Sequence, residues 1–514
     1  MIQRSTLRPT AIVLISLLLL GCERLFGPTE AELSDFSDYV YRLDTLQLRE
    51  HFSQVLNADT AHDEVLTAIR QCYNGKLEND RLSLWFTRMG VADEADELLA
   101  WLRREVPAAG LDSTAFKLSE IAQDLSVVHL LAFDSLGIDI NTLLPRLDYN
   151  LTHAYMHYAV GQRYGFVNPD RLLNQLDRKT EGKGYMRLFD YEVEAPDYAG
   201  TVSQLLSDNR MNYLCESTPD DPVYTVLQQR LATTTNVTER HTLSVNMERC
   251  RWQIKKPSAG ERMVFVNLPS QQLWAVCPDS VVNMRICFGK TRTKTPLLQS
   301  EITRVEVNPD WIITPNIIKN EVSVHAGDSA YFARNRYYIV DMSSGDTLNP
   351  AHVGVSQLKS GRLRVGQRGG AGNSLGRIVF RFPNNFSVYL HDTSNRGAFD
   401  LAQRTLSHGC VRVQKPFDLA LFAMPDMEEW DVEKLRLSMD IKPETERGRK
   451  YLEEHRDDRR PFRLITHRAV KPSLPLYIVY YTAYPNPESG KVELWSDVYG
   501  YDAVIASACR RWLL

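Results

Sequence analysis

The chain has 514 residues, of which 43% are hydrophobic and 24% are charged, and its formal net charge is −4. A chain of this length exceeds what one hydrophobic core organises, so we expect several domains. No long block of lysine and arginine offsets the acidic balance, which argues against a nucleic-acid-binding protein.

The N-terminal residues carry the pattern of an export signal. Two arginines precede a ten-residue run, 11–20, in which every residue except Ser16 is apolar. The run is shorter than the roughly 20 residues that span a bilayer and is typical of a signal peptide. The Leu-Leu-Gly-Cys at 19–22 resembles the lipobox of bacterial lipoproteins, in which Cys22 becomes lipidated. We therefore expect residues 1–22 to direct the protein to the periplasm or cell envelope, with a lipid anchor in the outer membrane. The alternative is an ordinary secretory signal with a chance cysteine.

Residues 30–254 carry the periodicity of helices. Within 95–106, apolar residues recur at three- and four-residue steps, as on one face of a helix. A second helix is expected over 150–160, with Asp148 as its N-cap and Gly161 just past its end. We therefore expect a helical domain in this region.

The expected helix over 150–160 carries His153 and His157 on one face. This spacing is compatible with a zinc ion, but no HExxH glutamate and no third ligand accompany the pair. A packed or solvated helix face is the favoured interpretation, and we expect no metal and no cofactor.

The pattern changes to short β-strands after a linker at 255–260. Residues 261–313 contain β-rich runs bounded by turn residues. Residues 316–337 are expected to be helical, and strands return within 377–390. His391 then lies at the end of a strand, which is a rigid place for a functional side chain.

The C-terminal region, 436–514, is expected to contain a charged helix over 444–460 and a β-hairpin. The hairpin would pair 476–481 with 491–495 across a Pro- and Gly-containing turn. The sequence leaves open whether these strands extend the preceding sheet or form a separate lobe.

The segment 407–412, Ser-His-Gly-Cys-Val-Arg, combines a thiol with the imidazoles of His408 and, nineteen residues before the thiol, His391. A thiol is nucleophilic as the thiolate, and its usual pKa of about 8.5 leaves little thiolate at neutral pH. A nearby imidazole can accept the proton. Gly409 permits a sharp turn that aims backbone N–H groups at an oxyanion. Cys410 is therefore a candidate nucleophile.

His391-Asp392-Thr393 followed by 407–412 resembles the catalytic signature of the bacterial L,D-transpeptidases of peptidoglycan. The resemblance is strong over about 240–435. Further segments that resemble landmarks of the large exported members are 246–249, 308–311, 314–318, 373–377 and 382–384.

The resemblance implies an α+β multidomain protein. A helical scaffold domain over 30–254 would precede a mostly β, β-sandwich-like catalytic domain over 261–435. A mobile, helical capping insert would occupy about 316–360, and 436–514 would form a C-terminal extension. Many relatives also carry a small peptidoglycan-binding module, of which we find no convincing copy in the sequence.

The resemblance also implies a reaction and its partners, the donor and acceptor stem peptides of peptidoglycan. Cys410 would attack the carbonyl of the third, diamino-acid residue of a tetrapeptide stem and expel the terminal D-alanine. His391 would accept the thiol proton, and the backbone N–H groups of Gly409 and Cys410 would form the oxyanion hole. An amine of a neighbouring stem would then take the acyl group.

The remaining residues of the signature have expected supporting roles. His408 either takes part in catalysis or orients the loop. The Asp392 backbone carbonyl, rather than its carboxylate, is expected to hold the imidazole of His391. The expected substrate-binding residues are Arg412, Ser407, Tyr389, Trp311, Asn316 and Asp392, although core packing explains the aromatic ones nearly as well.

Other functions share these features. An L,D-carboxypeptidase or amidase would use water as the acceptor, and a related enzyme would transfer the stem to a lysine of an outer-membrane lipoprotein. A non-catalytic peptidoglycan-binding scaffold is an alternative from another class, against which the thiol–imidazole pair argues. Papain-like peptidases are disfavoured because they place the cysteine well before the histidine in the chain.

Overall fold

The computed structural model describes residues 43–514 apart from 61–62, 79–82, 88–89, 177–186, 257–259 and 459–461. The expected signal sequence and Cys22 lie outside the described residues. By contacts the chain divides into two compact units, of which the first comprises Met1–Arg104, Phe116–Tyr158 and Tyr198–Leu214, and the second the remainder. In neither unit is a described helix long and apolar enough to cross a membrane.

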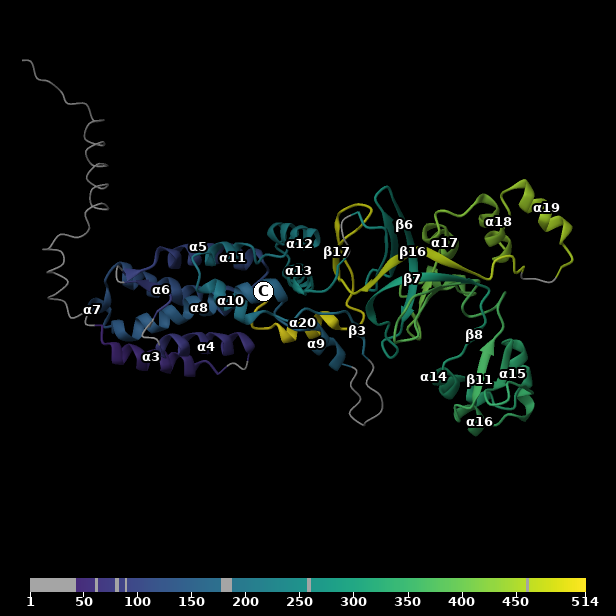
Figure 1. Cartoon of the computed structure of the whole chain (residues 1–514), viewed down its shortest axis with the longest axis horizontal. Helices are drawn as coiled ribbons and strands as arrows, with labels where there is room; N and C mark the ends of the chain where they lie inside the picture. Colours follow the sequence, from purple (N-terminus) through teal and green to yellow (C-terminus); the bar gives the residue numbers. More distant parts are fainter. Residues whose placement is uncertain are drawn as a thin grey trace, which may run out of the picture. The chain divides into compact units, whose positions relative to one another are not determined.

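The first unit is built from helices, as the periodicity predicted (Figure 1). Asp44 caps α3 by accepting hydrogen bonds from the N–H groups of Leu46 and Gln47, which satisfies donors left free at a helix start. The elements that lie wholly or mainly in this unit are α3 (Thr45–Ala58), α4 (Glu64–Glu78), β1 (Phe86–Thr87), β2 (Gly90–Val91), α5 (Asp93–Ala108), α6 (Leu118–His129), α7 (Phe133–Leu136), α8 (Ile140–Tyr164), α10 (Tyr198–Leu205) and α11 (Arg210–Cys215).

Helix α8 begins ten residues before the expected start at residue 150, so the predicted caps were wrong. Asp148 is fully buried inside α8, where its carboxylate accepts hydrogen bonds from the Tyr73 hydroxyl and the Leu84 N–H. The Asp148 carboxylate, which the sequence suggested as an N-cap, thus accepts hydrogen bonds from residues outside α8. Gly161 also lies within the helix. The absence of a side chain there leaves room for the Phe166 ring, because a Cβ would come within 2.2 Å of it.

The two histidines of α8 are packing residues. His153 and His157 are buried, and their ring centroids lie 4.1 Å apart. The His157 Nδ1 lies 2.9 Å from the His153 carbonyl oxygen, and its Nε2 lies 3.3 Å from the Asp63 carboxylate. Across the described residues, no group of three or more potential metal ligands is found.

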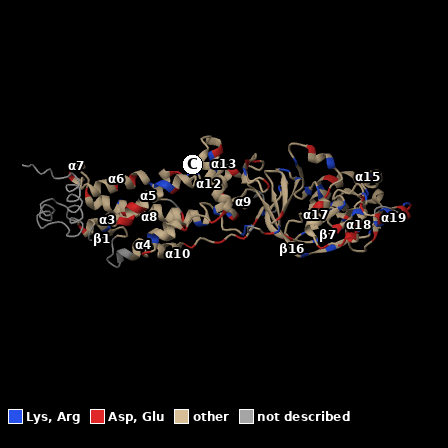
Figure 2. Cartoon of the chain, turned by 90° about the horizontal axis from the view of Figure 1, so that it is seen from above, with Lys and Arg blue, Asp and Glu red and all other residues tan. Residues whose placement is uncertain are grey.

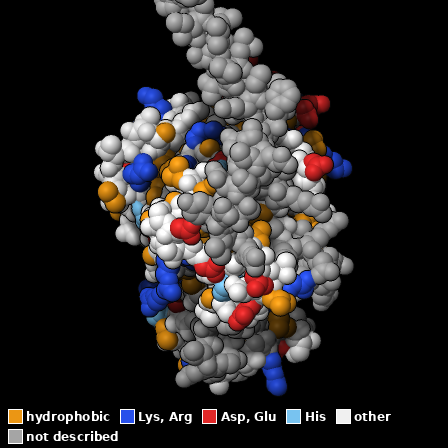
Figure 3. All heavy atoms as spheres, turned by 90° about the vertical axis from the view of Figure 1, so that its left-hand side faces the viewer, with side chains coloured by type: hydrophobic (Ala, Val, Ile, Leu, Met, Phe, Trp, Pro, Cys, Tyr) orange, Lys and Arg blue, Asp and Glu red, His pale blue; other side chains and the backbone are white. Residues whose placement is uncertain are grey.

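Charges are mixed throughout the described residues. Figure 2 shows acidic and basic residues interspersed along the ribbon of the described residues. On the face drawn in Figure 3, apolar, acidic and basic side chains of described residues alternate as well. These surfaces agree with the small net charge of the chain.

The second unit contains helices around a large sheet. Helix α13 is capped by Asn236, which accepts a hydrogen bond from the Glu239 N–H. The helices of this unit are η1 (Ser113–Phe116), α9 (Pro169–Gln175), α12 (Pro222–Thr233), α13 (Val237–Arg251), η5 (Arg396–Asp400), α17 (Pro416–Ala423), α18 (Glu429–Ser438), α19 (Glu446–Glu454) and α20 (Tyr501–Ala508), besides those of an insert.

The large sheet has ten strands, and its pairings return on themselves because β12 pairs with both β13 and β7. The mostly β character expected after residue 261 is confirmed. Its strands are β3 (Phe189–Asp190), β4 (Met263–Asn267), β5 (Gln272–Cys277), β6 (Ser280–Gly289), β7 (Leu297–Val307), β12 (Ile378–Arg381), β13 (Leu390–His391), β14 (Thr405–Ser407), β15 (Val411–Val413) and β16 (His467–Val479).

The C-terminal region completes this sheet. Strand β16 lies parallel to β4 and antiparallel to β7, which answers the question that the sequence left open. The expected hairpin forms from β17 (Ala483–Pro485) and β18 (Val492–Leu494). Its first strand begins later in the chain than expected, because 476–479 belong to β16.

The insert between β7 and β12 contains helices, as expected, and adds an antiparallel sheet that the sequence did not predict, so it is a small α/β subdomain. Its antiparallel sheet has the order β10-β9-β11-β8 and encloses its own apolar core, which includes Ile318, Phe332 and Ile339. Its elements are β8 (Trp311–Ile312), α14 (Pro315–Ile317), η2 (Ile318–Val322), η3 (Ser323–His325), α15 (Ser329–Arg334), β9 (Tyr337–Asp341), β10 (Thr347–Leu348), η4 (Pro350–His352), α16 (Val355–Lys359) and β11 (Leu363–Gln367).

A buried ion pair fixes the end of α13. The Glu248 and Arg251 side chains are fully buried, with 3.4 Å between Oε2 and Nη1. Glu248 Oε1 also accepts hydrogen bonds from the backbone N–H groups of Phe166 and Val167. Removing one partner of such a pair leaves an uncompensated charge in the interior.

We predict that Glu248→Ala lowers the free energy of unfolding of the second unit by about 3 kcal/mol, because buried Arg251 and two backbone N–H groups lose their acceptor. Urea unfolding followed by tryptophan fluorescence measures the change. Glu488→Ala, at an exposed turn position, is the matched control and should leave the transition unchanged. Equal midpoints for the two variants would contradict the prediction.

Candidate functional site

The pairing of β13 with β15 brings the predicted nucleophile and base together. These strands are parallel, with Leu390 opposite Val411 and His391 opposite Arg412. Cys410 directly precedes this ladder. Because opposite residues point to the same face and alternate residues share a face, His391, Cys410 and Arg412 project from one side of the sheet. Leu390 and Val411 project from the other and are buried.

His391 is held as a neutral imidazole. Its ring is buried, and Nδ1 lies 2.5 Å from the backbone carbonyl oxygen of Asp392. Burial, together with the positive charge of Arg412, lowers the pKa of His391 to about 4. With the proton on Nδ1, Nε2 keeps the lone pair that can accept a proton from a thiol.

Cys410 is partly accessible, and its Sγ lies 3.9 Å from the Ser387 carbonyl oxygen. The surrounding protein atoms raise the pKa of the Cys410 thiol, whereas a backbone hydrogen bond at Tyr389 and the charges of Arg412 and Arg381 oppose the rise. Desolvation of the thiol and of His391 thus favours the uncharged pair in the resting site.

The turn before Cys410 is braced by Ser407. The Ser407 hydroxyl accepts a hydrogen bond from the Gly409 N–H (3.1 Å) and donates to the Cys410 carbonyl (2.6 Å). The Gly409 carbonyl accepts a hydrogen bond from the Thr295 hydroxyl, and its φ of 120° lies where glycine is favoured.

These contacts bear on two expectations. The Gly409 N–H already has an acceptor within the protein, whereas the described residues supply none for the Cys410 N–H, which is thus the better placed donor of the expected oxyanion hole. Ser407 is buried, and its hydroxyl braces the turn, so its expected contact with a substrate stays a prediction.

Asp392 also has an internal role. Its carboxylate accepts hydrogen bonds from the Arg377 N–H (2.9 Å) and from the Arg396 guanidinium (2.8 Å), and the residue is 6% exposed. Both contacts lie within the protein, so the expected contact of Asp392 with a substrate stays a prediction. Its backbone carbonyl holds His391, as proposed from the sequence.

Two arginines place positive charge beside the thiol. Arg412 faces the same side as Cys410, and its buried Nε has no hydrogen-bond partner among the described residues. The guanidinium of Arg381 lies 4.2 Å from the centroid of the Tyr389 ring and pairs with Glu306 at 2.8 Å. Such a cluster can bind a carboxylate or stabilise a developing anion.

The contact that His408 makes favours a role in orienting the loop over a direct role in catalysis. Its Nε2 lies 2.6 Å from Oε1 of Glu321, which belongs to η2 of the insert. The contact ties the loop that carries Cys410 to the insert. Trp311 and Asn316, the other expected cleft residues, also lie in the insert, where Trp311 packs on the insert core and Asn316 is exposed.

Sequence reasoning missed Arg381, Glu306 and Glu321. A strand that ends in arginine, as 378–381 does, gives a weak signal of a charge aimed at a site. Glu321 carried no signal, because it lies 87 residues from His408.

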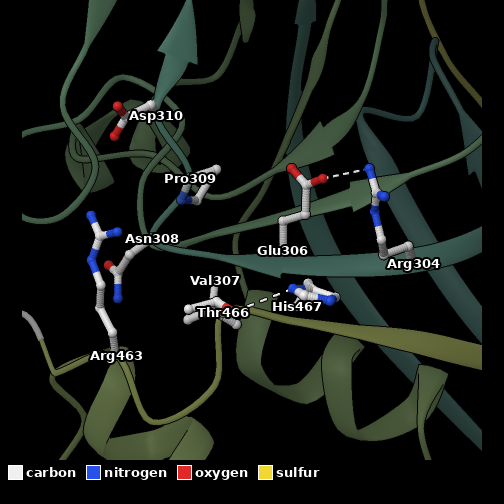
Figure 4. A pocket seen from close by; sticks show the side chains of 9 residues that line it. All are labelled: Arg304, Glu306, Val307, Asn308, Pro309, Asp310, Arg463, Thr466 and His467. Atoms are coloured by element: carbon white, nitrogen blue, oxygen red, sulfur yellow. Dashed lines mark hydrogen bonds and ion pairs between the residues drawn. The ribbon is translucent and has the colours of Figure 1, made fainter.

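A pocket of about 370 Å³ opens on the sheet at β7 (Figure 4). We call it the β7 pocket. Its lining residues are Arg304, Glu306, Val307, Asn308, Pro309, Asp310, Arg463, Thr466 and His467.

Comparisons with known proteins agree with this arrangement. Residues 261–432 match the family model described as the L,D-transpeptidase catalytic domain, and 63–231 match the model described as the scaffold domain. A protein of Haemophilus influenzae with the name "Putative L,D-transpeptidase" is 28% identical over 252 residues, which is 48% of this chain and 46% of that protein. The chain thus matches about half the length of this curated relative, and the resemblance seen in the sequence is confirmed.

The uncharged resting pair predicts the pH dependence of alkylation. The thiol loses its proton only above its own raised pKa, and His391 gains a proton only as the pH falls toward about 4. We expect the rate of Cys410 alkylation by iodoacetamide to rise steadily from pH 6 to beyond 9, as measured by peptide mass spectrometry.

Cys277 is the internal control for this experiment. It is partly exposed, and a hydrogen bond from Ser280 lowers the pKa of its thiol, so it should react at lower pH than Cys410. A plateau of Cys410 reactivity between pH 5 and 8 would instead reveal a preformed thiolate–imidazolium pair.

The contact between His408 and Glu321 predicts the mobility of the insert. Both side chains are partly exposed, and such pairs contribute about 0.2–1 kcal/mol. We expect Glu321→Gln to speed amide hydrogen exchange in η2 by up to about fivefold. Glu428→Gln, an exposed helix-start position without a capping bond, should leave that exchange unchanged. No change in the Glu321 variant would contradict a tether at this point.

Proposed function

The chain carries the catalytic domain of the L,D-transpeptidase family after a scaffold domain, and we propose that it is a cysteine-dependent peptidoglycan L,D-transpeptidase. The observation that supports this most directly is the β13–β15 register, which presents His391 and Cys410 on one face of the sheet.

The first half-reaction forms a thioester. Nε2 of His391 accepts the Cys410 proton as Sγ attacks the carbonyl carbon of the third residue of a tetrapeptide stem. The carbonyl oxygen becomes an oxyanion beside the Cys410 N–H and the guanidinium of Arg412. The carbon–nitrogen bond then breaks, and the terminal D-alanine leaves with the proton from His391.

The second half-reaction transfers the acyl group. The side-chain amine of a neighbouring stem attacks the thioester carbon, and His391 takes a proton from the attacking nitrogen. When the carbon–sulfur bond breaks, the proton returns to the sulfur. The neutral imidazole suits both steps, because a base must be unprotonated when the nucleophile arrives.

The place of action follows from the N-terminal pattern alone. We propose that the protein acts in the periplasm, held to the outer membrane by a lipid on Cys22. The scaffold domain would carry the catalytic domain between that anchor and the peptidoglycan. Attachment of a lipoprotein to peptidoglycan would use the same thioester with a lysine amine as the acceptor.

Mass spectrometry of a reaction with disaccharide-tetrapeptide tests the proposal. We expect cross-linked dimers and release of one D-alanine per cross-link. Cys410→Ala should lower the rate by roughly four orders of magnitude or more, and His391→Ala by about 10²- to 10⁴-fold. Cys277→Ala, which removes a thiol outside the site, is the matched control and should keep full activity.

The products separate the alternatives. Tripeptide without dimer would indicate an L,D-carboxypeptidase. Equal product from the wild type and Cys410→Ala would overturn the catalytic role of this thiol. Binding of peptidoglycan without any turnover would favour a non-catalytic scaffold.

A further inference from the structure

The β7 pocket lies on the face of the sheet that carries the nucleophile. The printed pairings align His467 with Glu306, Glu306 with Val379 and Val379 with His391. Because directly opposite residues share a face, the pocket residues Glu306 and His467 project on the same side as His391. Successive strands lie about 4.8 Å apart, so the pocket begins about 10 Å from His391.

A partly exposed row of residues connects the pocket with the thiol. Arg304 of β7 lies opposite Arg381 of β12, and Arg381 covers the Tyr389 ring. The Tyr389 carbonyl in turn accepts the N–H of Val411, the residue after Cys410. All the linking side chains are partly or fully accessible, so a peptide can lie along this row.

The acidic side chains of the pocket are already engaged. Glu306 pairs with Arg304 at 2.6 Å and with Arg381 at 2.8 Å. The Asp310 carboxylate accepts hydrogen bonds from the Gly369 N–H (2.8 Å) and the Tyr338 hydroxyl (3.1 Å).

Arg463 is a lining cation that pairs with neither Glu306 nor Asp310. It is exposed, and among the described residues it has no ion pair or hydrogen bond. Figure 4 shows its guanidinium beside Asn308, on the side of the pocket opposite the Arg304–Glu306 pair. The Thr466 hydroxyl and the His467 imidazole, 3.2 Å apart, supply further polar groups.

We propose that the β7 pocket is a distal subsite that binds a free carboxylate of a peptide stem, with Arg463 as the specificity-determining residue. This inference rests on the proposed function. The three strand spacings between β7 and β15 amount to roughly 14 Å, and an extended peptide advances about 3.3 Å per residue. An acceptor stem whose side-chain amine lies at the thioester covers this distance with that long side chain and two extended residues. Arginine matches a carboxylate with two parallel hydrogen bonds.

Arg463 lies outside the part of the chain that matches the catalytic-domain model, which ends at residue 432. The C-terminal region therefore adds Arg463, Thr466 and His467 to a pocket whose other lining residues lie within the matched domain.

Steady-state kinetics with Arg463→Ala tests the subsite. We expect KM for the stem peptide to rise about five- to tenfold while kcat stays within twofold, because the lost contact binds substrate and transition state equally. The rise in KM should be smaller at 0.5 M NaCl, and Arg463→Lys should partly restore the wild-type KM. Arg510→Ala, at another exposed arginine with no ionic contact among the described residues, is the matched control and should keep the wild-type KM.

Two substrate arms identify which stem carries the carboxylate. D-alanine release without acceptor reports the donor stem, and dimer formation at saturating donor reports the acceptor stem. A KM change in either arm supports the subsite and assigns it. Amidating the stem carboxylates should raise the wild-type KM by a similar factor and leave no further effect of Arg463→Ala.

The subsite would be overturned if Arg463→Ala and Arg463→Gln both keep the wild-type KM in both arms and melt at the wild-type temperature. That result would leave the transpeptidase assignment intact. If the wild type shows no turnover, the proposed function fails instead. Titration of Cys410→Ala with tetrapeptide and with its amidated form then still tests the pocket, because binding needs no reaction. Equal affinities for the two peptides would overturn it.

Discussion

The short parallel pairing of β13 with β15 is the constraint on which the site depends. It sets His391 opposite Arg412 and places Cys410 just before the ladder. Both strands are short, so the neighbouring strands fix their positions. Strand β12 pairs with β13 through Val379 and Phe380, and β6 pairs with β15 through Ile286 and Cys287. The closed pairing of the sheet leaves these strands no free edge, which suits a site in which small displacements are costly.

Burial and positive charge act in opposite directions at this site. Desolvation lowers the pKa of His391 and raises that of Cys410, whereas Arg412 stabilises a thiolate and destabilises an imidazolium. The resting pair is therefore uncharged, and negative charge becomes favourable only when it develops on the substrate oxygen or on the sulfur. This balance supports the proposed mechanism, in which the thiol stays protonated until a carbonyl carbon is in place.

The catalytic face extends well beyond the pair. The insert reaches the Cys410 loop through Glu321 and His408, and the β7 pocket continues the same face toward Arg463. Both lie far in sequence from the signature segment. The proposed selection of substrate on this face would thus depend on segments that the signature does not contain.

Much of the organisation was readable from the sequence, because local chemistry decides it. The helical periodicity before residue 254, the β-rich pattern after 261, the strand that ends at His391 and the turn at Gly409 all depend on neighbouring residues. The thiol–imidazole signature pointed to the family for the same reason, and Cys410 stays the predicted nucleophile. Tertiary structure alone decided that Asp148 is a buried acceptor instead of a cap, and that β16 completes the catalytic sheet. It also decided that the Gly409 N–H is occupied, that Arg381 pairs with Glu306, that Glu321 contacts His408 and that Arg463 lines the β7 pocket. These facts depend on which distant groups meet, and a side chain's hydrogen-bonding capacity does not reveal the partner that will satisfy it.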